Sequence, residues 1–283
     1  MLRDIFTAAG INSVAAVDAQ ALRPANRRLF DSLPCETELY CVFFTVPYLC
    51  RRPQPPLSAY AAVPDYHLFI NRLAPEVEGY FSAAYPGRFA RMYSDHSPFA
   101  EVFGAAKAGL GIIGENSLLI TPLHSSFVFI GECVCALSRH ELTAEGIPVE
   151  NCDIRYCQNC GACKRACPGG CAGLADRTGC ISALNQKKKL EEWEADAVAR
   201  SGWIWGCDVC QSVCPHTIRA IENGSAYTRI PFFTEGCING NDPAAAVSAM
   251  NDEEFARYPF SWRPRRVIER NIRLCAGEAE SEN

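Results

Sequence analysis

Apolar residues in the first half of the chain follow both helical and extended patterns. The segment 2–9 has the spacing of a short helix that Gly10 ends, and the apolar run 41–47 predicts a buried strand. Beyond a proline-rich loop, the segment 65–81 has a spacing that predicts a longer helix with an apolar face formed by Leu68, Leu73, Val77 and Phe81.

A further helix is expected where Ser97 precedes Pro98, because serine is a common N-cap and proline is favoured at the first helical position. Gly109 ends this helix. Two apolar runs, 117–121 and 126–133, then predict a hairpin or two adjacent strands, both largely buried. The first part of the chain is therefore expected to be a mixed α/β domain.

The pattern changes after residue 138, where cysteine, glycine and short polar links replace the periodic apolar segments until about residue 236. From residue 241 to 274 helical spacing returns, with acidic residues first and arginines last, which predicts two helices joined near Pro259. We expect an α+β protein with three parts: an α/β domain over 1–145, a cysteine-rich domain over 146–236, and a short helical tail over 237–283.

Composition narrows the class of protein. Of 283 residues, 48% are hydrophobic and 21% are charged, as in ordinary globular proteins. The longest apolar stretches, 41–50 and 127–137, are shorter than the roughly 20 residues that span a bilayer, and no apolar signal core follows the N-terminus. We expect a cytoplasmic protein with no membrane partner.

The formal net charge of −5 does not favour nucleic-acid binding by the whole molecule, but five arginines and one acid lie between 261 and 274. These arginines either contact a phosphate backbone or form a solvated helix face, and both interpretations stay open.

Seventeen cysteines form an odd and unevenly spaced set, which favours thiolate ligands in a reducing compartment over a disulfide framework. One run has the spacing C-x2-C-x2-C-x3-C-P that is typical of bacterial ferredoxins, and a later run, C-x2-C-x3-C-P, has three cysteines. The first run contains Cys157, Cys160, Cys163 and Cys167, and the second contains Cys207, Cys210 and Cys214.

In such proteins the last cysteine of each run binds the other cluster. We therefore expect two [4Fe–4S] clusters, the first bound by Cys157, Cys160, Cys163 and Cys214. Cys167, Cys207 and Cys210 would bind the second cluster, whose fourth ligand is Cys180 or Cys171; we choose Cys180. Zinc is the alternative metal, although a tetrahedral zinc site does not call for this longer run.

The remaining cysteines are expected to be small buried apolar residues. Among them, Cys133 and Cys135 would face the same side of a strand. This set comprises Cys35, Cys41, Cys50, Cys133, Cys135, Cys152, Cys171, Cys237 and Cys275.

Several motifs resemble those of the epoxyqueuosine reductases, which are cobalamin-dependent iron–sulfur enzymes of queuosine-tRNA synthesis. The resemblance covers Asp65-Tyr-His67, the stretch 95–131, the eight cysteines with Cys180-Ile-Ser, and 206–211. It implies a flavin-reductase/nitroreductase-like cobalamin domain, then a ferredoxin-like double-cluster domain. It also implies a low-potential electron donor, a tRNA substrate, and cobalamin contacts at Tyr66, His67, Asn116 and Ser182.

The resemblance further implies that Asp95 is the proton donor. A free aspartic acid titrates near 3.9, so burial against the cofactor and Phe99 would have to raise its pKa for it to hold a proton at neutral pH. Alternatively, Asp95 caps the helix that begins at Pro98, or His96 is the donor.

The sequence also departs from the family. Glu115 replaces a usual lysine, and 185–188 replaces a hydrophobic and acidic run. Ile70 occupies the glycine place of the D-x-H-x-x-G motif, so His67 is not expected to bind cobalt. The helical-repeat domain of longer members does not follow Leu274, which leads us to expect weaker tRNA recognition. Alternative functions are reduction of a small electrophile or corrinoid, as in reductive dehalogenases, and electron transfer without catalysis.

Overall fold

The computed structural model describes residues 1–35 and 38–277. Contacts divide the chain into two compact units, and the first comprises Met1–Pro47 and Tyr66–Gln158. The second comprises Tyr48–Asp65 and the chain from Asn159 onward. Within the described ranges, no helix combines the length and the apolar character that crossing a membrane would require.

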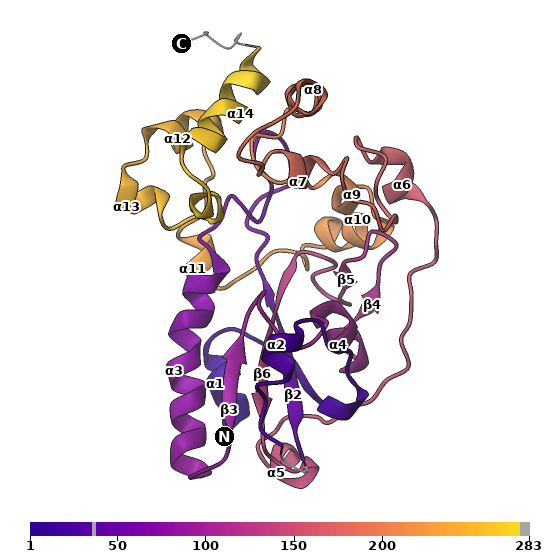
Figure 1. Ribbon diagram of the computed structural model, residues 1–283, viewed down its shortest axis with the longest axis vertical. Helices are drawn as coiled ribbons and strands as arrows, with labels where there is room; N and C mark the ends of the chain where they lie inside the picture. Colours follow the sequence, from indigo (N-terminus) through magenta and orange to yellow (C-terminus); the bar gives the residue numbers. More distant parts are fainter. Residues whose placement is uncertain (36–37, 278–283) are drawn as a thin grey trace. The chain divides into compact units, whose positions relative to one another are not determined.

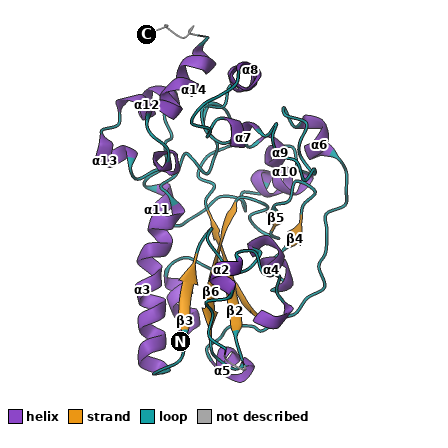
Figure 2. Ribbon diagram, viewed as in Figure 1, coloured by secondary structure: helices purple, strands orange, loops and turns teal. Residues whose placement is uncertain are grey.

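The first unit is built on a four-stranded antiparallel sheet with the order β1-β2-β6-β3 (Figure 2). Every residue of β2 is buried, which agrees with the strand predicted at 41–47. The strands are β1 (Ser13–Asp18), β2 (Tyr40–Pro47), β3 (Ala90–Tyr93) and β6 (Val128–Cys135). A separate two-stranded sheet pairs β4 (Ile112–Ile113) with β5 (Leu119–Ile120).

Helices pack against this sheet. The long helix α3 (Tyr66–Ala84) contacts β3, and α4 (Glu101–Lys107) contacts β2 and β6 (Figure 1). A Cβ at Gly104 would overlap the ring of Phe43, so a residue without a side chain lets α4 approach β2 closely. The other helical segments of this unit are α1 (Leu2–Ala8), η1 (Ala19–Ala21), α2 (Arg27–Phe30) and α5 (Arg139–Ala144).

Three expectations for this unit were wrong in detail. The helix expected from Pro98 begins at Glu101, because the Ser97 hydroxyl bonds to the Phe99 backbone and to Glu132 and does not cap the helix. The runs 117–121 and 126–133 each contain a strand, but β5 pairs with β4 and β6 pairs with β2 and β3, so the hairpin alternative was wrong apart from an isolated bridge between Thr121 and Ser125. In α3, Phe69 and Ile70 are buried, whereas Leu68 is exposed.

The second unit is mainly helical. Its helices are short, and the segment 48–65 joins them through backbone bonds from Ser58 N–H to the Trp205 carbonyl and from Thr228 N–H to the Leu49 carbonyl. They are α6 (Ala162–Ala166), α7 (Ile181–Leu184), α8 (Glu192–Ser201), α9 (Val209–Ser212), α10 (Pro215–Glu222), α11 (Pro231–Thr234), α12 (Pro243–Ala249), α13 (Asp252–Phe255), η2 (Pro259–Trp262) and α14 (Arg266–Ala276).

The C-terminal segment forms more pieces than the two helices expected. Capping boxes and prolines divide it: Asn251 caps α13, and Pro259 opens η2. Helix α14 packs against α8, and its buried Asn271 side chain donates to the Asn185 and Ile204 carbonyls at 2.6 and 2.9 Å. Asn185, a departure from the family pattern, therefore helps to hold the tail on the cysteine-rich part of the same unit.

The arginines of this segment behave differently from one another. Arg263 lies over the Trp262 ring and donates to the Gln186 carbonyl, and Arg265 lies over Phe255. Arg270 bonds to Asn271, whereas Arg266 and Arg273 are exposed. Three of the five arginines thus make contacts within their own unit. The three-part domain division expected above stays a prediction.

Candidate active site and cysteine loops

Asp95 lies between β3 and α4 in a left-handed backbone conformation with a φ of 56°. The Tyr66 hydroxyl donates to Asp95 Oδ1 at 2.6 Å, and His67 Nε2 lies 3.2 Å from Oδ2. Tyr66 and His67 are the first two residues of α3, so the end of that helix holds both donors toward the aspartate. The structure thus brings together three of the residues that the sequence singled out.

These contacts set the charge of Asp95. The hydrogen bond from His67 is the main cause that lowers the pKa of the Asp95 carboxyl, with burial opposing it and Tyr66 adding to it. The raised pKa that a proton-holding aspartate would need is therefore not found in the chain alone. Phe99 lies in the buried core and packs edge-on against Phe30. Asp95 makes no N-cap bond to α4, whose N-cap residue is Ala100.

Two glutamates near Asp95, the buried Glu132 and the half-buried Glu101, were missed by the sequence reasoning. Burial is the main cause that raises the pKa of Glu101 to about 7, and the charge of Asp95 raises it further. Burial likewise raises the pKa of Glu132 to about 8, although Ser97 donates to its carboxyl. Among the described residues, Glu101 Oε1 and Glu132 Oε2 are buried and accept no hydrogen bond. Near pH 7, Glu132 is therefore mostly the neutral acid and Glu101 is about half protonated.

A sequence signal for these glutamates did exist. Glu132 interrupts the apolar strand 128–135, and Glu101 interrupts the apolar segment 99–103. Charged residues are almost never fully buried without a partner. An acid inside an apolar run therefore identifies a candidate functional group.

The other expected cofactor contacts have structural partners of their own. The Tyr66 ring stacks on Phe129 with 4.3 Å between centroids. Asn116 is buried in the turn between β4 and β5, where its Oδ1 accepts from Leu118 N–H at 3.3 Å. Ser182 belongs to the second unit and accepts from the Gln186 amide there.

Five of the eight proposed ligands lie in short helices or directly beside them. Cys163 lies in α6 and Cys210 in α9, while Cys167, Cys180 and Cys214 flank helices of the second unit. Since each loop is short, the sequence spacing largely fixes where its thiols lie.

Cys157 belongs to the first unit, where its N–H bonds to the Ile113 carbonyl and its sulfur accepts from Glu115 N–H at 3.3 Å. Hydrogen bonds to ligand sulfurs tune the potential of iron–sulfur clusters. Glu115 stands where the family commonly has lysine, and its backbone N–H supplies such a hydrogen bond to the Cys157 sulfur.

The loops after Cys167 and before Cys180 approach each other closely. A Cβ at Gly169 would overlap the Gly179 carbonyl oxygen, so this approach requires glycine. The Cys167 and Cys171 sulfurs are 3.8 Å apart, and Cys171 also contacts Cys180. The structure therefore places Cys171 among the thiols of the predicted second cluster. It lies next to Cys167, a predicted ligand, and next to Cys180, the alternative to Cys171 as the fourth ligand.

Asp208 organises the loop between Cys207 and Cys210. It is fully buried and accepts from Ala59 N–H at 2.6 Å and from the Gln211 amide at 3.2 Å. Burial raises the pKa of this carboxyl to about 7, and Arg51 opposes the shift. These bonds tie the cysteine loop to the segment 48–65 of the same unit.

The cysteines outside the runs do not all follow the expectation of burial. Cys41, Cys133, Cys135 and Cys171 are buried, whereas Cys35 is exposed. Cys50, Cys152, Cys237 and Cys275 are half-buried. Every described cysteine has a free thiol.

Comparison with known proteins gives these features a context. Residues 156–217 match the model of the 4Fe–4S double cluster binding domain. The chain is 30% identical to an epoxyqueuosine reductase of Gloeobacter violaceus over 90% of this chain and 80% of that protein. It is 32% identical to one from Synechocystis over 56% of this chain and 54% of that protein.

Solved structures share the fold. The structure of epoxyqueuosine reductase from Streptococcus thermophilus superposes with a TM-score of 0.75 and 19% sequence identity. The alignment covers 97% of this chain and 79% of that one. A crystal structure of epoxyqueuosine reductase with an epoxyqueuosine-modified tRNA stem loop gives a TM-score of 0.71 at 21% identity, with coverage of 97% and 79%. With its double-cluster domain and its extended identity to the Gloeobacter protein, this chain belongs to the epoxyqueuosine reductase family of oxidoreductases.

Proposed function

We propose that this protein reduces epoxyqueuosine in tRNA to queuosine, using electrons that pass through two [4Fe–4S] clusters to cobalamin. The observation that carries the proposal is the contact of Asp95 with Tyr66 and His67 in a member of this family. It places three side chains that can transfer protons next to one another in the first unit. The tRNA substrate is supported by the relative whose structure includes a modified stem loop.

The cluster ligands follow from the sequence spacing and are compatible with the free thiols of the described chain. Cys157, Cys160, Cys163 and Cys214 are proposed for one cluster, and Cys167, Cys180, Cys207 and Cys210 for the other. Cys180 also lies close enough to Cys207 and Cys171 to influence their titration. A low-potential external donor would supply the electrons.

Cobalamin is the further cofactor that the family implies, and features of the first unit fit it. The Asp95 and His67 side chains are 61% and 40% exposed, and the stacked pair of Tyr66 and Phe129 lies beside them. Two exposed polar side chains therefore lie next to an aromatic pair, and together they form a surface that the flat corrin ring of cobalamin can contact. When bound, cobalamin supplies a metal centre that transfers electrons to the substrate.

His67 acts through Asp95 in this proposal, because its Nε2 lies 3.2 Å from Asp95 Oδ2 and is engaged by that carboxylate. Its imidazole therefore orients the aspartate. Asn116 and Ser182 remain contacts proposed from the resemblance alone.

Proton supply is the task of this chain's own residues. Removing an epoxide oxygen as water consumes two electrons and two protons, and negative charge develops on that oxygen as the electrons arrive. Asp95 is ionised in the chain alone, and its two oxygens each receive a hydrogen bond from Tyr66 or His67. The Asp95 carboxylate can therefore pass on a proton only after receiving one from Tyr66 or His67, and that donor is reprotonated from solvent.

Glu101 completes this arrangement as a half-buried acid. Its pKa of about 7 keeps a large fraction protonated at neutral pH, and the charge of Asp95 is one of the causes. A neutral Glu101 avoids a second negative charge beside Asp95. The Asp95 carboxylate can then remain the acceptor for both donors.

The test uses anaerobically purified protein whose iron and cobalt contents have been measured. It is mixed with tRNA that contains epoxyqueuosine and with a low-potential reductant, and digested tRNA is analysed by mass spectrometry. Conversion to queuosine supports the proposal. No conversion by protein that holds both clusters and cobalamin contradicts it. Free epoxyqueuosine nucleoside in a parallel reaction tests whether the tRNA itself is required.

A further inference from the structure

A lysine-rich loop lies against helix α14 in the second unit. This lysine loop, residues 185–189, carries three consecutive lysines where the family has a hydrophobic and acidic run. The Arg270 guanidinium donates to the Lys188 carbonyl at 3.4 Å, and the buried Asn271 amide donates to the Asn185 carbonyl at 2.6 Å. Tertiary contacts therefore hold the lysine loop beside α14, although 82 and 86 positions separate the bonded residues in the sequence.

Helix α14 has one buried face and one basic face. The buried face is formed by Val267, Ile268 and Asn271. Arg266 and Arg273 are exposed and lie about one helical turn before and after Arg270, so the three arginines share a side of the helix. Because Arg270 bonds to the lysine loop, this basic face continues into the exposed lysines.

Positive charge is concentrated on this surface. Among the described residues, no ion pair is formed by the exposed cations Lys188, Lys189, Arg266 and Arg273, whereas Lys187 pairs with the buried Glu194. The segments 185–190 and 261–274 contain eight basic residues and one acid, and acids begin again at Glu191. A basic surface on a chain with a net charge of −5 suits a polyanionic partner.

An exposed tryptophan adjoins the same surface. The Trp262 side chain is 56% exposed, and the Arg263 guanidinium lies over its ring at 3.7 Å from the centroid. Arg263 also donates to the Gln186 carbonyl of the lysine loop at 3.0 Å. Proteins that bind unpaired nucleic acid combine cations that track the backbone with aromatic rings on which bases stack. Trp262 and the neighbouring cations have this combination.

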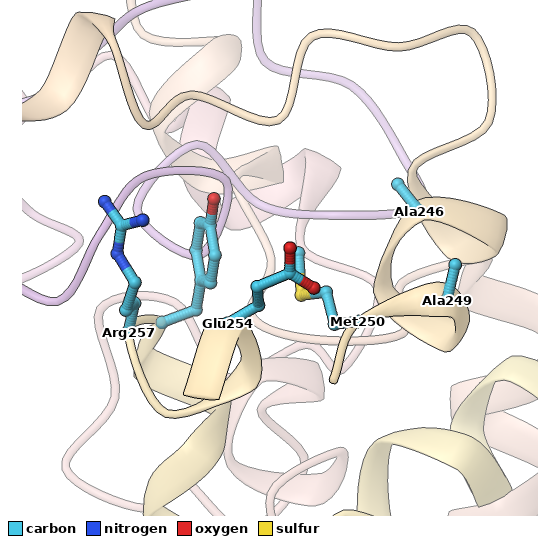
Figure 3. Close-up of a pocket in the computed structure, with 6 residues that line it drawn as sticks. Ala246, Ala249, Met250, Glu254 and Arg257 are labelled. Carbon is cyan, nitrogen blue, oxygen red and sulfur yellow. The ribbon is translucent and has the colours of Figure 1, made fainter. Parts of the chain in front are cut away.

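Elsewhere in the tail, positive and negative charges lie together. A pocket of about 390 Å³ is lined by Ala246, Ala249, Met250, Glu254, Arg257 and Tyr258. Figure 3 shows the side chains of Arg257 and Glu254 at this one pocket. A phosphate here would meet a carboxylate as well as a guanidinium. Arg257 therefore belongs to a less favourable phosphate site than the arginines of α14.

We propose that the lysine loop and the basic face of α14 bind the phosphate backbone of an RNA stem–loop, and that Trp262 stacks on an unpaired base. This inference rests on the proposed function, because it supplies a contact surface for the tRNA substrate. Of the two interpretations of the C-terminal arginines, it favours contact with a phosphate backbone.

The experiment measures binding of a fluorescently labelled, unmodified anticodon stem–loop to the anaerobic, cluster-loaded protein without reductant. Anisotropy titrations are repeated from about 0.05 to about 0.2 M salt, over which affinity should fall steeply. Lys188→Gln combined with Arg273→Gln should weaken binding at least about tenfold. The slope of log K against log salt should become shallower by about 1.4–1.8, because two phosphate contacts are lost.

The matched control combines Arg229→Gln with Arg257→Gln, two exposed arginines of the same unit, and should leave affinity and slope unchanged. Trp262→Leu should weaken binding of the stem–loop about tenfold and leave binding of a fully paired RNA unchanged. Iron content equal to that of the natural protein shows that each variant is folded.

Equal binding by the two double variants overturns the proposal. Binding of the natural protein to phosphatidylserine vesicles but not to the stem–loop also overturns it and assigns the surface to a membrane. The readout needs no reduction of epoxyqueuosine. RNA binding that depends on Lys188 and Arg273 without conversion would contradict the proposed function alone, and conversion with equal binding by both double variants would contradict this inference alone.

Discussion

The functional groups around Asp95 and those of the cysteine loops in the second unit are brought together in different ways. At Asp95, the interacting groups come from α3, from the loop before α4, from α4 itself and from β6, and burial decides their charge. In the cysteine loops, seven of the eight proposed ligands lie within two runs, in short helices or in the loops beside them, so spacing along the chain brings the thiols of each run together.

This difference determines how each region responds to substitution. A carboxyl whose pKa depends on its neighbours is changed by altering any neighbour, and the effect depends on pH. A cluster ligand is required individually, since each of four thiolates holds one corner of the cube. Four substitutions separate the two regions, from the largest expected effect to the smallest.

The largest effect is expected in the cysteine loops. Cys180→Ala should remove a ligand and lower the iron content from about eight to about four atoms per chain. Its matched control is Cys171→Ala, which removes a neighbouring thiol and should leave iron unchanged. Iron analysis and electron paramagnetic resonance of the reduced protein provide the measurement. The reverse result, with iron lost only in the Cys171 variant, would make Cys171 the fourth ligand.

Asp95→Asn should reduce the rate of epoxyqueuosine conversion by about 10²–10⁴-fold, because a positioned proton-transfer group is lost. Iron content and the spectra of the clusters should stay the same. Asp31→Asn, an exposed aspartate of the same unit, is the control. Quantification of queuosine in digested tRNA measures the effect, and equal rates for the Asp95 and Asp31 variants would remove Asp95 from the reaction.

Glu132→Gln should stabilise the protein at high pH. The folded pKa of about 8 lies above the ordinary value of 4.5, so the glutamate binds its proton more tightly in the folded state. Stability therefore falls as pH rises from about 4.5 to about 8, and the neutral glutamine avoids that loss. We expect a gain of about 5 kcal/mol at pH 9, from a pKa difference of about 3.5 units at 1.36 kcal/mol each, and little change near pH 4.5.

Denaturant unfolding at the two pH values measures this difference. The gain should disappear at the acidic pH, where both the variant and the natural residue are neutral. A stability difference that does not change with pH would mean that Glu132 is not neutral in the folded protein.

The smallest effect is expected from Tyr66→Phe, which keeps the ring on Phe129 and removes the donor to Asp95 Oδ1. Loss of one hydrogen bond of about 1 kcal/mol should raise the pKa of Asp95 by less than one unit. It should lower the rate of epoxyqueuosine conversion about fivefold. The acidic limb of the pH–rate profile should move to higher pH. An unchanged profile would show that Tyr66 does not act on the ionisation of Asp95.

The sequence by itself determined the family and the cysteine runs. Both rest on local motifs, and a short loop keeps its thiols close whatever surrounds it. The strand at 41–47 and the helix at 65–81 were also predicted correctly, because each carries its periodic pattern within one segment. The assignment of individual cysteines to the two clusters remains a prediction.

Only the tertiary structure decided the charge of the carboxyls. Asp95 was expected to need a raised pKa, yet His67 and Tyr66 lower it, while burial gives the raised pKa to Glu101. Ser97 was expected to cap a helix, yet it bonds to Glu132. Each of these outcomes depends on which side chains from distant segments exclude water from a group. A linear sequence does not encode that desolvation in any single motif.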